Sequence, residues 1–86
     1  MREYTYEEHI ERTRAAIERR IVQARDHAPG SVQHGAYLGT AETILTGLLR
    51  NVEVSDTDET RLRRLIENER SRSAPLSEFS TSKAHV

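Results

Sequence analysis

The sequence predicts a small all-α protein built on an antiparallel helical hairpin, and three observations lead to this fold class. Apolar residues recur every three or four positions from residue 6 to residue 28, which is typical of an amphipathic helix. Residues 34–52 are almost entirely apolar, small or hydroxyl-bearing, which is typical of a buried helix. Only a short break at Pro29 and Gly30 separates the two segments. A break that short favours two antiparallel helices.

The first helix is expected over about residues 5–28. Its start carries a capping box, in which the Thr5 hydroxyl accepts the amide of Glu8 and the Glu8 carboxylate reaches back to the amide of Thr5. Its end is set by Pro29, because the residue before a proline disfavours helical geometry. The side chains expected to face the core are Tyr6, Ile10, Thr13, Ile17, Ile21, Ala24 and Ala28.

The second helix is expected over about residues 31–51, with Ser31 as its N-cap. One apolar face consists of Leu38, Ala41, Leu45, Leu48 and Val52. A second face combines small and apolar side chains, namely Gly35, Ala36, Gly39, Thr40, Thr43, Ile44 and Gly47. Because the first helix can cover only one face, the second needs the third helix or another chain.

A short third helix is expected over about residues 56–70, capped by Ser55 or Asp56. Its apolar stripe is narrow, which is typical of a partly docked surface helix; the stripe consists of Leu62, Leu65 and Ile66. Residues 71–86 are rich in serine and poor in apolar side chains, so a disordered tail is expected there. The chain is thus expected to form one domain, residues 1–70, followed by this tail.

The composition favours association between copies of the chain. The chain has 86 residues, of which 35% are hydrophobic, and a core of that size rarely contributes more than about 3–5 kcal/mol. No cysteine is present, so neither a disulfide nor a thiolate zinc site can add stability. We therefore expect a homo-oligomer, most simply a dimer with a two-fold axis near the second helix.

Charge and hydropathy exclude several function classes. The net charge of −1 argues against a general affinity for nucleic acid or for an anionic membrane. The third helix is net acidic and no helix-turn-helix turn precedes it, so no nucleic-acid polymer is expected as a partner. No apolar run reaches a membrane-spanning length and the N-terminus lacks a signal-peptide core. A cytoplasmic protein is expected.

A row of small residues on the second helix predicts a close contact. Each glycine inside a helix costs about 1 kcal/mol relative to alanine, so the row needs a compensating interaction. A tight helix crossing, within or between chains, supplies one. The alternative is that the glycines make room for a flat ligand. We expect the oligomer interface at Gly35, Gly39, Thr43 and Gly47.

Arginines and tyrosines of the first two helices form a candidate ligand site. In an oligomer, arginines from different chains could converge on a phosphate while tyrosines stack on a base. The simpler interpretation is a solvated charged face, with a tyrosine packed beside the Thr5 cap. The candidate residues are Tyr4, Tyr6, Arg12, Arg19, Arg20, Tyr37 and Glu42.

Glu42 lies in the middle of the apolar helix, where a buried carboxylate must be paired or protonated. The expectation is an edge position on the helix, or pairing with an arginine or tyrosine of the first helix or of a neighbouring chain. No second carboxylate or nucleophile occupies a matching position, so a catalytic role is not expected. His27 and His34 flank the turn, but beyond Asp26 they have no obvious third and fourth ligands, which favours a solvated loop over a metal site. No metal and no cofactor are expected.

Two functions remain open at this level. The first is a non-enzymatic, oligomeric interaction protein, such as a bacterial or phage accessory protein that acts on a protein partner. The second is a small-molecule binder whose sites lie between chains and which sequesters a nucleotide signal, in the manner of an anti-defence cyclic-nucleotide sponge.

Overall fold

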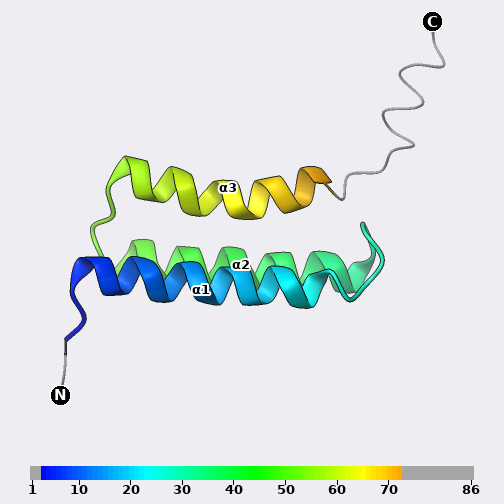
Figure 1. Cartoon of the computed structure of the whole chain (residues 1–86), viewed down its shortest axis with the longest axis horizontal. Coiled ribbons are helices and arrows are strands. Elements are labelled where there is room, and N and C mark those ends of the chain that lie inside the picture. Colours follow the sequence, from blue (N-terminus) through cyan, green and yellow to red (C-terminus); the bar gives the residue numbers. More distant parts are fainter. Residues whose placement is uncertain (1–2, 73–86) are drawn as a thin grey trace, which may run out of the picture.

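The computed structural model describes residues 3–72, which form three α-helices and no strands: α1 (Tyr6–Ala24), α2 (Val32–Asn51) and α3 (Asp56–Arg72). Helices α1 and α2 form an antiparallel hairpin, and α3 runs back alongside both of them (Figure 1). The all-α class, the hairpin and the third helix are therefore confirmed. The expected tail lies outside the described residues, apart from Ser71 and Arg72, which belong to the last turn of α3.

Helix α1 begins as predicted but ends four residues early. The capping box is complete, because the Thr5 hydroxyl accepts the Glu8 amide at 3.1 Å and the Glu8 carboxylate accepts the Thr5 amide at 2.9 Å. The helix ends at Ala24 because the chain reverses direction over residues 25–31, with Gly30 at a φ of 79°. As a result Ala28 is exposed and does not join the core.

Helix α2 is buried on one side only, which corrects the expectation of a helix buried all round. Its N-cap is Ser31, whose hydroxyl accepts the amide of His34 at 3.1 Å. Both α1 and α3 contact the side formed by His34, Leu38, Ala41, Leu45 and Leu48. No other helix among residues 3–72 covers the opposite side, which carries the small-residue row: Gly35 and Thr43 are exposed, and Gly39 and Gly47 are half-buried.

Helix α3 is held at its start by a residue of α1. The Ser55 hydroxyl accepts the Asp58 amide at 3.2 Å and so caps the helix, as predicted. The Tyr6 hydroxyl donates to the Asp58 carboxylate at 2.6 Å and accepts the Ser55 amide at 3.1 Å. Tyr6 thus supplies the second half of a capping box from a distant part of the chain. The Tyr6 side chain is exposed, so the expectation that it faces the core is wrong.

A single core lies between the three helices. It consists of Ile17, Ile21, Ala24, Leu38, Ala41, Leu45, Leu48, Leu62 and Ile66. The predicted stripe of α3 is confirmed except at Leu65, which is only half-buried. No helix among residues 3–72 has an apolar stretch long enough to cross a bilayer.

Candidate functional site

The most unusual side chain in the described structure is a buried carboxylate, that of Glu69. The Glu69 side chain is only 2% exposed, although α3 is otherwise a polar helix. It continues the buried stripe of α3, three residues after Ile66 and seven after Leu62. A buried carboxylate needs charged or hydrogen-bonding partners, and these come from all three helices.

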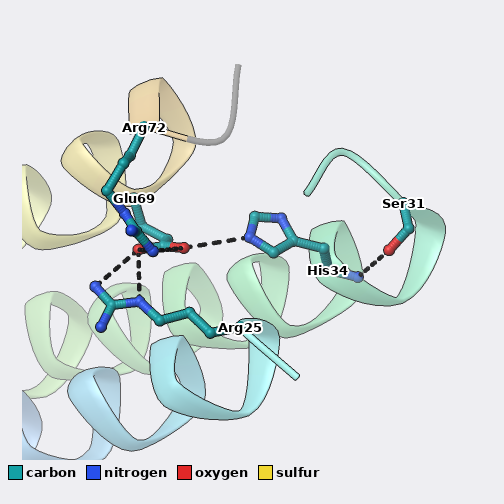
Figure 2. Close-up of polar contacts among 5 residues, drawn as sticks. All are labelled: Arg25, Ser31, His34, Glu69 and Arg72. Carbon is teal, nitrogen blue, oxygen red and sulfur yellow. Dashed lines mark hydrogen bonds and ion pairs between the residues drawn. The ribbon is translucent and has the colours of Figure 1, made fainter. Parts of the chain in front are cut away.

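Within the part of the chain that the structure describes, the side chains of Arg25, Arg72 and His34 contact the Glu69 carboxylate (Figure 2). Arg25, the C-cap residue of α1, places Nε and Nη2 at 3.0 Å from Oε1. Arg72, in the last turn of α3, donates from Nη2 to Oε1 at 3.3 Å and to Oε2 at 3.2 Å. His34, in the first turn of α2, places Nε2 at 3.3 Å from Oε2. The cluster therefore joins the end of α1, the start of α2 and the end of α3.

Two opposing effects set the pKa of Glu69. Burial raises it, because the charged form loses contact with water. Hydrogen bonds from Arg25, Arg72 and His34 lower it and outweigh burial, so the pKa of Glu69 lies below its usual value of 4.5. The carboxylate is therefore ionised at neutral pH.

His34 corrects the expectation of a solvated loop histidine. Its side chain is 3% exposed, and its amide is fixed by the Ser31 cap. The signal for burial was present in the sequence, because His34 lies four residues before Leu38 on the apolar face of α2. The same spacing argument applies to Glu69 and Ile66. Both residues were missed because polar side chains were not counted as part of an apolar stripe.

Two hollows adjoin the arginines of this cluster. The larger, about 450 Å³, lies between α1 and α3 and has Ile21, Val22 and Leu65 as its apolar wall. The smaller, about 160 Å³, lies at the hairpin turn and is bounded by His27 and Pro29. Arg25, Glu69 and Arg72 line both. The cluster thus offers charged groups to two accessible spaces.

The structure brings together only part of the predicted ligand site. The Arg12 guanidinium lies 4.3 Å from the centre of the Tyr4 ring, and Tyr4 packs edge-on against His9. Tyr6 is engaged in the cap of α3. Tyr37 lies at the other end of the hairpin, where its ring stacks on His27 at 5.5 Å. No single site within one described chain contains all the predicted tyrosines.

The other predicted ligand residues are also dispersed. Arg19 is exposed, and Arg20 donates from Nη1 to the side chain of Gln23 at 2.7 Å. Glu42 is 48% exposed and pairs with Arg70 of α3 at 2.8 Å. Its partner therefore comes from the third helix and not from the first. The Arg70 hydrogen bond outweighs partial burial and lowers the pKa of Glu42.

The small-residue row makes no crossing within the described chain. A Cβ atom placed on Gly35, Gly39 or Gly47 would meet no neighbouring part of the chain within 4 Å. Thr43, between them, is exposed. The glycines of the row therefore have no close helix crossing within residues 3–72.

No three or more His, Asp or Glu side chains among residues 3–72 lie where they could share a metal ion. Comparison with protein-family models, with curated proteins and with solved structures found no match. Any function must therefore be inferred from the site geometry itself.

Proposed function

We propose that this chain is a non-enzymatic interaction protein that self-associates through the open side of α2 and presents the resulting helical surface to a protein partner. The observation that carries the proposal is the uncovered small-residue row. Gly35, Gly39 and Gly47 weaken α2 as an isolated helix, and nothing within one described chain packs against them. A second helix at close range supplies the missing contact.

The polar side chains on this side of α2 favour contact with another helix. The Thr40 hydroxyl donates to the carbonyl of Ala36 at 3.0 Å, and the Thr43 hydroxyl donates to that of Gly39 at 3.1 Å. The Asn51 amide donates to the carbonyl of Gly47 at 2.7 Å. Because the two threonine hydroxyls bond to their own helix, covering them leaves neither hydroxyl proton without an acceptor.

The row is also compatible with two-fold symmetry. Gly39 and Gly47 each lie four residues from Thr43, on either side of it. In an antiparallel pair of α2 helices with the axis at Thr43, Gly39 of one protomer faces Gly47 of the partner subunit. Such an isologous contact is the commonest form of homo-oligomer, and the glycines permit the two backbones to approach closely.

The test is a Gly39→Leu variant measured by sedimentation velocity at micromolar concentration. A leucine fits the protomer, because no atom lies near the added Cβ, and it favours the helix by about 1 kcal/mol. It holds two α2 helices apart, so we expect the dimer dissociation constant to rise at least about tenfold with unchanged helix content.

Gln33→Leu is the matched control, since Gln33 is exposed on the same helix but lies outside the row. This variant should remain dimeric. A wild-type chain that is monomeric at micromolar concentration contradicts the proposal, and so does a Gly39→Leu variant of unchanged mass.

A further inference from the structure

The charges around Glu69 do not cancel. Two guanidinium groups, those of Arg25 and Arg72, share one carboxylate (Figure 2). Among the described residues, neither arginine has an ion pair with any other acid. Among the described side chains, the cluster of Arg25, Arg72 and Glu69 therefore has two positive charges and one negative charge, even when His34 is neutral.

Both arginines retain unused donors at an accessible surface. A guanidinium carries five N–H groups, and Arg25 directs only its Nε and Nη2 atoms at Glu69. Arg72 directs only Nη2 at it. Their side chains are 51% and 61% exposed. The remaining N–H groups are thus available to a second acceptor from outside the protein.

Arg25 and Arg72 both line the smaller hollow. It is bounded by His27, whose ring is held against Tyr37 by stacking, and by Pro29. His34 also lines it and is the first-turn residue of α2, a turn that contains no acid. Among residues 3–72, Glu69 is the only acid that lines the hollow, and it already accepts hydrogen bonds from Arg25 and Arg72 and lies beside His34. A volume of about 160 Å³ accommodates one tetrahedral anion with some water.

We propose that this hollow binds a phosphate group, held by Arg25 and Arg72. The buried Glu69 carboxylate fixes both guanidiniums before the ligand arrives, so less side-chain entropy is lost on binding. The ligand is inorganic phosphate or a phosphate ester. In the ester, the organic part lies in the larger adjoining hollow, against Val22 and Leu65. The site faces the core side of α2, so it does not depend on self-association through the opposite side.

The experiment is a titration of the full chain followed by two-dimensional NMR, with inorganic phosphate and phenyl phosphate as separate probes and chloride at matched ionic strength. We expect saturable shifts of the Nε–Hε signals of Arg25 and Arg72 with both phosphates and none with chloride. Tighter binding of phenyl phosphate, with shifts at Val22 and Leu65, identifies an ester as the ligand class. Equal affinity for both probes identifies inorganic phosphate.

Substitutions distinguish binding of phosphate at this hollow from a general attraction of phosphate to positively charged residues. Arg72→Gln should weaken phosphate binding at least about tenfold, because hydrogen bonds to charged groups are lost. Arg19→Gln removes the same charge from an exposed position of α1 and should leave the affinity unchanged. Pro29→Glu places an acid at the rim of the hollow without touching the Glu69 contacts, and it should weaken binding even if Arg72→Gln loosens α3. The proposal is overturned by unsaturable shifts, or by equal losses in the Arg19 and Arg72 variants.

Discussion

Glu69 connects three helices through one buried charge. Its carboxylate receives hydrogen bonds from Arg25, Arg72 and His34, which lie on different elements of the fold. Removing water from a carboxylate costs several kcal/mol, and charge-assisted hydrogen bonds offset this cost only when the geometry is satisfied. The main effect of the cluster is therefore to fix the position of the C-terminal end of α3 against the α1–α2 hairpin, with little net gain in stability.

A Glu69→Gln variant tests the role of the buried carboxylate through the pH dependence of the unfolding free energy. The pKa of Glu69 is lowered by folding, so its contribution is fully present above its usual value of 4.5 and is lost as the pH falls through the folded value. At neutral pH the variant should lose about 1–3 kcal/mol of unfolding free energy in urea.

As the pH falls below about 4.5, the Glu69→Gln variant should also lose less stability than the wild type, because it has no carboxylate to protonate at this position. Glu67→Gln, an exposed neighbour, is the control and should change the stability by less than about 0.5 kcal/mol. If the unfolding free energy of the wild type and of Glu69→Gln fell equally as the pH is lowered, protonation of Glu69 would not be coupled to folding.

At the scale of the elements, α3 depends on α1 at both of its ends. Tyr6 completes the cap at its start, and Arg25 holds Glu69 near its end. The packing between these two points is light, because only Leu62 and Ile66 are fully buried apolar residues of α3. The polar contacts at the ends therefore decide how often α3 opens from the hairpin.

A Tyr6→Phe variant should loosen the start of α3. It removes the acceptor of the Ser55 amide and the donor to Asp58, so hydrogen exchange of the Ser55 amide should accelerate about fivefold or more. Exchange in the core turn around Leu45 should be unaffected. Tyr37→Phe, which keeps the ring stacked on His27, is the control and should leave exchange at Ser55 unchanged. Equal exchange in Tyr6→Phe and wild type would contradict the assigned cap.

The local features of these elements could be predicted from the sequence, whereas the contacts between them could not. The caps at Thr5, Ser31 and Ser55 follow from interactions over three residues, and all three are present. The sequence predicts the end of α1 four residues too late, because the length of the reversing loop depends on how the hairpin closes. The partners of Glu42 and Glu69 depend on where α3 docks, which no local pattern specifies.

At the scale of the whole molecule, the three described helices leave one side of the central helix α2 uncovered. Helices α1 and α3 both contact α2, and the shared core lies on the side of α2 formed by Leu38, Ala41 and Leu45. Figure 1 shows the backbones of the three helices running alongside one another. The sequence indicated correctly that the first helix could cover only one face of the second. It did not show that the third helix would leave the small-residue row open, since that depends on the direction from which α3 approaches.

Site-specific cross-linking tests the proposed association most directly. The chain contains no cysteine, so Thr43→Cys introduces a single thiol, and a two-fold axis at residue 43 brings it close to its symmetry mate. A disulfide requires Cα atoms within about 4.4–6.8 Å, which only a close helix crossing provides. Under mild oxidation Thr43→Cys should form a covalent dimer as its main product, while Gln33→Cys should remain monomeric. A Thr43→Cys chain that stays monomeric, or equal cross-linking at both positions, would contradict self-association through this side of α2.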